Sequence, residues 1–301
     1  MGYFKMTLTE SLTNIVNAVG GAVDAGAHTK TELLRQIISA CGGNCDELPD
    51  NLESTLLQAV AEHVSGGGSG VVVCEEESVY TNHIVAASGI LKVSLPNATR
   101  LGDTMFNGCK TLVEINAPKV KYIDSGCFGR CSSLTSVYLP KLNGVGLSVF
   151  AGCTSLETIE LPLLYTIESC TFVGCTNLTN IHLPYAESVI ANAFDGCVSL
   201  TKIELPCVTS VDAEAFVNCT NLFAVILRTT ETVCIIQVDS FKNTKIMDEN
   251  GMPTGKGFVY IPASMDAAYR EVYEPAFADL GMDGAFDLLF RKIEDYPEIC
   301  G

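Results

Sequence analysis

The stretch "CTNLTNIHLPYAESVIANAFDGCVSLTKIELP", residues 175–206, contains one pattern twice. The apolar, cysteine and proline residues of the first copy return 22 positions later in the second: Cys175 and Cys197, Leu178 and Leu200, Ile181 and Ile203, Leu183 and Leu205, Pro184 and Pro206. A fixed period of this length is typical of a chain that folds as a stack of equivalent turns.

The period continues in both directions along the chain. Three residue types recur at it: Phe106, Phe128, Phe150, Phe172, Phe194 and Phe216; Cys109, Cys131, Cys153, Cys175, Cys197 and Cys219; Pro96, Pro118, Pro140, Pro162, Pro184 and Pro206. One further step back from the first clear copy reaches Val71, and "FVYIP", ending at Pro262, resembles a last strand of the same kind. We therefore expect about nine repeats between Val71 and Pro262.

Each repeat is expected to contribute two short strands. The pattern LxxIxLP places a β-branched residue and a leucine two positions apart, which is the period of a strand with one buried face, and the proline then ends the strand. A second extended piece runs through Ile123, Val145, Ile167, Val189 and Val211. Because one repeat is too small to bury its own apolar face, neighbouring repeats must stack into a parallel β-solenoid.

The full pattern LxxIxLPxxxxxIxxxxFxxCxx resembles the leucine-rich repeats of the bacterial surface-antigen, or BspA-like, type. The resemblance covers roughly Val71 to Pro262 and implies a right-handed solenoid, recognition or adhesion at a bacterial surface, and no catalysis. Departures from the pattern are Ala117, Arg228 and Thr244. The predicted fold is a leucine-rich-repeat solenoid with a parallel β ladder and a 22-residue period, preceded by a small α-helical region and closed by C-terminal helices.

Four regions follow from this interpretation. Residues 1–65 carry helix capping boxes and form an N-terminal α-helical region, residues 66–70 are a Gly/Ser linker, residues 71–262 are the solenoid, and residues 263–301 are a helical cap. In the cap, Ser264 is expected to start a helix whose apolar side chains seal the last repeat: Met265, Ala268, Tyr269 and Val272. Near the N-terminus, a coiled-coil rhythm from Leu8 to Ala22 is compatible with homo-oligomerisation or with a small helical cap.

Composition limits the partners. The formal net charge of −17 repels phosphate backbones, which excludes nucleic acid as a natural partner. The sequence shows neither a membrane-spanning run nor a signal peptide, so it gives no localisation of its own; a cell-surface or extracellular place is suggested by the family resemblance alone.

The cysteines predict packing rather than chemistry. Stacked Cβ atoms lie about 4.8 Å apart, whereas a disulfide needs about 3.5 to 4.5 Å, so the cysteine column should consist of buried free thiols. Cys41 and Cys45 form a lone CxxxC without a second ligand pair. No nucleophile and base are arranged for catalysis, and we predict no enzyme activity, no cofactor and no metal.

The outward positions of the main strands form the predicted ligand-binding face. It consists of Tyr138, Glu160, His182, Glu204, Glu114, Thr158, Asn180 and Lys202. His182 stands between two carboxylates, which favour the charged imidazole. Glu160, His182 and Glu204 form either a pH-sensitive or metal-binding contact or a solvated row of charges. The lack of a further metal ligand nearby favours the solvated row.

These features favour a non-enzymatic binding or adhesion module that recognises a protein or a glycan through the solenoid face. The alternative is a structural component of a phage tail or bacterial surface appendage, with the N-terminal helices as an anchor or oligomerisation segment.

Overall fold

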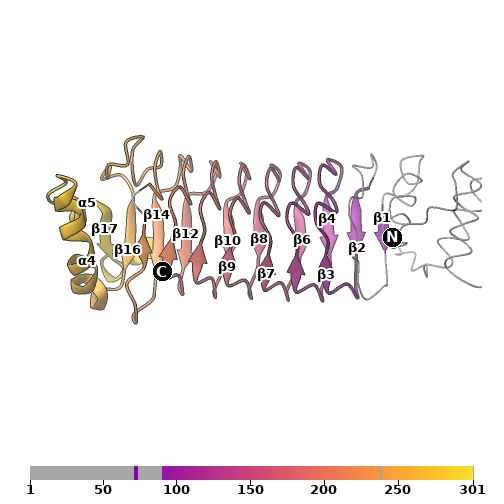
Figure 1. Ribbon diagram of the computed structural model, residues 1–301, viewed down its shortest axis with the longest axis horizontal. Coiled ribbons are helices and arrows are strands. Elements are labelled where there is room, and N and C mark those ends of the chain that lie inside the picture. The colour runs from indigo at the N-terminus through magenta and orange to yellow at the C-terminus, as the bar shows by residue number, and fades with distance from the viewer. Residues whose placement is uncertain (1–70, 74–89, 238, 301) are drawn as a thin grey trace, which may run out of the picture.

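The computed structural model describes residues 71–73, 90–237 and 239–300, which form an elongated parallel β-solenoid (Figure 1). The predicted helical region at 1–65 and the linker at 66–70 lie outside the described residues, as do Cys41 and Cys45.

Within the described residues, one face of the solenoid is built from nine parallel main strands. They are β1 (Val71–Val73), β2 (Lys92–Ser94), β4 (Glu114–Asn116), β6 (Ser136–Tyr138), β8 (Thr158–Glu160), β10 (Asn180–His182), β12 (Lys202–Leu205), β14 (Ala224–Leu227) and β16 (Phe258–Ile261). From β2 to β14 the strands begin 22 residues apart. At the N-terminal end the register differs from the expectation, because Val72 rather than Val71 pairs with Val93.

A second, shorter ladder lies along another side of each repeat, where the sequence predicts it. Its strands are β3 (Arg100–Leu101), β5 (Tyr122–Ile123), β7 (Gly144–Val145), β9 (Thr166–Ile167), β11 (Ser188–Val189), β13 (Ser210–Val211) and β15 (Ile235–Ile236). In each of these strands the second residue is buried. Two buried apolar faces therefore meet inside every repeat.

The phenylalanine column forms a continuous stack through the core. Neighbouring rings from Phe106 to Phe241 are nearly parallel in the first five pairs, and all centroids are separated by 4.9 to 5.5 Å. Phe150 and Phe172, for example, lie 5.5 Å apart at an interplanar angle of 5°. Phenylalanines one repeat apart in the sequence are thus neighbours in space, and three extra residues before Phe241 do not interrupt the stack.

The cysteine column consists of buried, unbridged thiols, as predicted. Each thiol from Cys131 to Cys219 donates a hydrogen bond to the carbonyl oxygen of a phenylalanine in the preceding repeat, at 3.0 to 3.2 Å. Burial raises the pKa of the Cys175 thiol to about 12 and that of Cys131 still further. At neutral pH these thiols act as small, protonated packing groups.

Thr244 shows how the array tolerates a departure from the repeat. Its hydroxyl donates to the carbonyl of Phe241 at 2.7 Å and accepts the backbone N–H groups of Ile246 and Met247. A threonine thus occupies the cysteine position because it supplies the buried hydrogen bonds of the turn that follows.

The C-terminal cap is less purely helical than the sequence predicts. Its elements are the 3₁₀ helix η1 (Ala263–Met265), α4 (Asp266–Asp279), α5 (Ala285–Leu289), the strand β17 (Phe290–Lys292), the 3₁₀ helix η2 (Ile293–Asp295) and α6 (Pro297–Cys300). β17 pairs in parallel with β16 and adds a tenth strand to the main face. None of the helices that the structure describes is both long enough and apolar enough to cross a membrane.

Two details of the predicted cap helix are wrong. Ser264 does not cap α4, since it lies inside η1 and Met265 precedes α4 without a side-chain cap. Val272 is 41% exposed, and Tyr273 takes the place expected for it against the core. The four-residue step from Tyr269 to Tyr273 brings both rings to the same side of the helix.

The two tyrosines close the free edge of the second ladder. The Tyr269 hydroxyl accepts the backbone N–H of Cys234 at 3.0 Å. The Tyr273 hydroxyl accepts the N–H of Ile236 and donates to the carbonyl of Cys234, both at 2.7 Å. These hydroxyls stand where a further strand would otherwise pair, so the ladder ends without exposed backbone groups at these positions.

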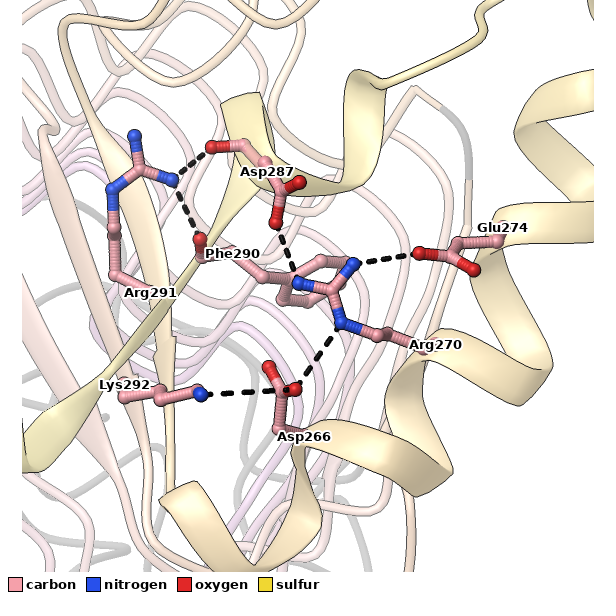
Figure 2. Close-up of polar contacts among 7 residues, drawn as sticks. All are labelled: Asp266, Arg270, Glu274, Asp287, Phe290, Arg291 and Lys292. Carbon is pink, nitrogen blue, oxygen red and sulfur yellow. Dashed lines mark hydrogen bonds and ion pairs between the residues drawn. The ribbon is translucent and has the colours of Figure 1, made fainter.

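Arg270 fixes the cap elements to one another (Figure 2). Its guanidinium binds Asp266 and Glu274 within α4 and Asp287 of α5, with N–O distances of 3.1, 2.6 and 2.6 Å. It also lies 4.2 Å from the centre of the Phe286 ring. One planar cation with several donors therefore sets the relative position of α4 and α5.

Candidate functional site

The main-strand face, meaning the outward side chains of the main strands, is open in the middle of the solenoid. β8 and β10 alternate between outward, exposed side chains and one inward side chain. The parallel register places Glu160 beside His182 and Thr158 beside Asn180. Four of the predicted face residues therefore lie together on two adjacent strands.

A shallow hollow of about 620 Å³ lies on this part of the main-strand face. Five of the predicted face residues line it: Tyr138, Thr158, Glu160, Asn180 and His182. The remaining lining residues are Thr135, Ser136, Val137, Leu139, Pro140, Ile159, Pro162 and Ile181. The Tyr138 side chain is 56% exposed at this surface.

The hollow coincides with an interruption of the main ladder. β6 does not pair with β8 in a sheet, nor β10 with β12. Where the main ladder is continuous, the residue after a main strand donates to the next repeat, as Ala117 N–H does to Tyr138 O at 3.0 Å and Leu161 N–H to His182 O at 3.1 Å. Among the described residues, Leu139 N–H has no such acceptor and Thr135 C=O receives no such donor, and the same holds for Leu183 N–H and Thr179 C=O between β10 and β12.

The Leu139 N–H and the Thr135 C=O give the hollow a donor and an acceptor that belong to no side chain. Both Thr135 and Leu139 line it. Backbone groups without a protein partner require water or a ligand, because a desolvated and unpaired N–H or C=O is costly. Water or a polar ligand at this interruption can therefore form hydrogen bonds with them.

Three predicted face residues lie outside the hollow and have partners of their own. Glu114 forms an ion pair with Lys92 of the preceding repeat at 2.5 Å. Glu204 forms an ion pair with Arg228. The Lys202 ammonium group donates to the backbone carbonyl of Ile299 at 2.9 Å. The predicted trio of Glu160, His182 and Glu204 is thus divided, with its last member engaged toward the cap.

No cluster of metal-binding side chains is found in the part of the chain that the structure describes. There, no three or more His, Cys, Asp or Glu side chains come together at a position suited to an ion.

Beyond β12 the main-strand face is covered by residues 293–300, the C-terminal segment. This segment folds back from the capped end so that the C-terminus lies beside β14 (Figure 1). Ile226, an outward residue of β14, is completely buried. It packs in a separate apolar cluster with Ala224, Tyr260 and Cys300, bordered by Phe223, Phe258, Ile293, Tyr296 and Ile299. This face of β14 and β16 is therefore an interior surface between two layers.

Polar contacts hold the C-terminal segment in place. Arg228 donates to the carbonyl oxygen of Cys300 as well as to Glu204, and Lys202 holds the neighbouring carbonyl of Ile299. The ring of Tyr296 meets that of Tyr260 edge-on at 5.5 Å. Burial raises the pKa of the Tyr260 phenol to about 12. Arg228, which replaces the proline of the repeat, thus links the C-terminal segment to Glu204 of β12.

Sequence reasoning found the polar side chains around the hollow but missed the hollow itself. Pro140 and Pro162 line it, yet equivalent prolines occur in the neighbouring repeats as well, from Pro96 to Pro206, and give no signal. The interruption between β6 and β8 separates two repeats whose patterns look alike in the sequence. One outward position of the main strands recurs every 22 residues, as Ser94, Asn116, Tyr138, Glu160, His182, Glu204 and Ile226. It changes from polar to apolar at Ile226, and this change is a sequence signal of a second covering layer.

Comparison with known families agrees with the observed fold. The BspA-type leucine-rich repeat region matches residues 84–166 and 145–254. The chain belongs to this family. The family description specifies six copies of the repeat, and the matched region contains the hollow of this BspA-type protein. Among proteins of curated function, none matches the chain.

Similar solved structures are bacterial leucine-rich repeat proteins. A leucine-rich repeat protein of Eubacterium ventriosum is 22% identical, with a TM-score of 0.50 over 54% of this chain and 45% of that one. A leucine rich cell surface protein of Faecalibacterium prausnitzii is 20% identical, with a TM-score of 0.36 over 59% of this chain and 64% of that one. The BspA-type chain therefore spans less than half of the Eubacterium protein, and that likeness concerns the fold alone.

Proposed function

We propose that this BspA-type protein is a non-enzymatic recognition module that binds a protein or glycan through the open part of its main-strand face. The observation that carries the proposal is the contrast along one face. The C-terminal segment covers the apolar outward residues of β14 and β16, whereas Tyr138, Glu160 and His182 remain exposed around a hollow. A large exposed aromatic beside polar groups is typical of a surface that meets a partner.

Family membership supports the same function. A solved protein with similar repeats is described as a cell surface protein. Solenoids present extended surfaces to partners, and recognition by such surfaces needs no catalytic group. We extend this setting to the present chain and propose that it acts at a bacterial surface.

The test is a binding screen of the intact chain against extracellular-matrix proteins and glycans. A double variant, Tyr138→Ala with His182→Ala, removes two side chains of the hollow. A matched control, Tyr165→Ala with Tyr185→Ala, removes two tyrosines that are 49% and 52% exposed outside the hollow. We expect the first variant to lose at least about tenfold in affinity and the control to keep it.

Retention of full binding by the hollow variant, with loss in the control, would reject this face. Failure of the intact chain to bind any protein or glycan in the screen would contradict the recognition function itself.

A further inference from the structure

We propose that the hollow binds a neutral oligosaccharide, with one sugar ring lying against Tyr138. This inference rests on the proposed recognition function and specifies its ligand. It follows from the chemistry of the groups that line the hollow, their exposure, and the charge of the chain.

The first argument is the type of hydrogen-bonding group. Ser136, Thr158 and Asn180 line the hollow with hydroxyl and amide groups that can both donate and accept. Thr135 also lines it, and its hydroxyl, which donates to the Val113 carbonyl at 3.3 Å, can still accept. The backbone adds the Thr135 carbonyl as an acceptor and the Leu139 N–H as a donor. A sugar ring carries adjacent hydroxyls that both donate and accept, so it can satisfy this mixed set without burying an unpaired group.

The second argument is the aromatic ring. Tyr138 is 56% exposed and lines the hollow together with Pro140 and Pro162. The face of an aromatic ring carries negative charge and attracts the slightly positive C–H groups of a flat apolar surface. A pyranose ring has such a C–H face in addition to its hydroxyls, and Tyr138 beside the polar groups matches both.

The third argument concerns charge. One carboxylate, that of Glu160, and one imidazole, that of His182, line the hollow. The two residues lie side by side on adjacent strands. No lysine or arginine lines it. With a net charge of −17, the chain repels sialylated or sulfated glycans, so the favoured ligand is uncharged.

The shape argues against a polypeptide as the main ligand. Protein interfaces depend on a few large side chains that enter well-packed, desolvated pockets. The hollow is open, and hydroxyl, amide and backbone groups contribute much of its lining. Its volume of about 620 Å³ lies within the range of small-ligand sites.

The absence of tryptophan from the sequence allows a direct test. In the intact chain, Tyr138→Trp keeps an aromatic platform and introduces a single tryptophan at the hollow, whose emission can be excited selectively. A control, Tyr185→Trp, introduces the same fluorophore at a tyrosine of similar exposure elsewhere. Both variants are titrated with the glycans retained by the wild-type chain on an array of neutral, sialylated and sulfated oligosaccharides.

We expect retention of neutral glycans, a saturable change of fluorescence in Tyr138→Trp, and no change in Tyr185→Trp. Tyr138→Ala should weaken binding by at least about tenfold, which is the loss typical of removing one stacking ring. Circular dichroism of each variant checks that the fold is kept.

Other outcomes overturn the proposal in distinguishable ways. Binding of charged glycans alone, or of neutral glycans without a signal from Tyr138→Trp, would reject the neutral-sugar site. Tyr138-dependent binding of a protein and of no glycan would reject the oligosaccharide but preserve the proposed recognition function. If the intact chain binds no protein and no glycan, both proposals fail.

Discussion

Two parts of the main-strand face differ although both are built from copies of the same repeat pattern. Over β8 and β10 the outward residues are polar and exposed, and they surround the hollow. Over β14 and β16 the equivalent positions hold Ile226 and Tyr260, which the C-terminal segment buries. The repeat thus requires apolar residues at the inward positions. The outward positions can carry polar residues that form an exposed surface or apolar residues that form a second core. The comparison makes three measurable predictions.

The largest effect is expected from equivalent substitutions in one column. Ile226→Ala removes a fully buried side chain, and we expect the free energy of unfolding to fall by about 2–5 kcal/mol. His182→Ala, two repeats earlier in the same column, changes an exposed side chain and should alter it by no more than about 0.5 kcal/mol. Urea unfolding followed by circular dichroism measures both. Equal effects of the two substitutions would show that the C-terminal segment does not cover β14 in solution.

A smaller effect is expected where the cap closes the second ladder. Tyr273→Phe leaves the buried N–H of Ile236 and one hydrogen bond of the Cys234 carbonyl unsatisfied. We expect a loss of about 1–3 kcal/mol in the free energy of unfolding. Tyr165→Phe, which removes a hydroxyl from an exposed tyrosine of the open part, serves as the control and should have almost no effect. A neutral result for Tyr273→Phe would mean that α4 does not close the ladder.

The last prediction compares the two parts by pH and tests whether water is excluded equally from the core beneath each of them. Burial raises the pKa of Cys175, in the repeat beneath the open part, and of Cys234, at the capped end, to about 12 each. An unfolded thiol titrates near pH 8.5, so above about that pH the unfolded chain releases a proton that the folded chain keeps. Stability is therefore full below about pH 8.5 and falls as the pH rises toward 12, by about 1.4 kcal/mol per pH unit and thiol.

The corresponding experiment measures unfolding under reducing conditions from about pH 8 to pH 11 for wild type, Cys175→Ala and Cys234→Ala. Each variant should lessen the slope of stability against pH by the same amount. A smaller change for Cys175→Ala than for Cys234→Ala would show that water reaches the core below the hollow.

The sequence predicted the contacts that follow the period. Phe150 meets Phe172, and Ile123 of the second ladder pairs with Val145, because residues 22 positions apart occupy equivalent places in adjacent repeats. The free thiols followed from the same geometry. The outward polar residues could be named for the same reason, and five of the eight predicted face residues line the hollow.

Apart from the hollow, the features that were missed involve segments unrelated by the period. β17 pairs with β16 from the cap, and α4 begins after a 3₁₀ turn rather than at Ser264. Val272 and Tyr273 are neighbours in the sequence, and the choice between them depends on where the free edge of β15 lies. A helix has several apolar side chains, and its partner decides which of them are buried.

By itself, the sequence determined the repeating half of this protein: a parallel solenoid with inward leucine, phenylalanine and cysteine columns and outward polar columns. The tertiary structure decided where the outward face stays open, through the interruption between β6 and β8 and the return of the C-terminal segment over β14. The physical reason is that contacts within the array are repeated and accumulate along the sequence. Each contact of the cap or the hollow occurs once, and it depends on how distant parts of the chain meet in space.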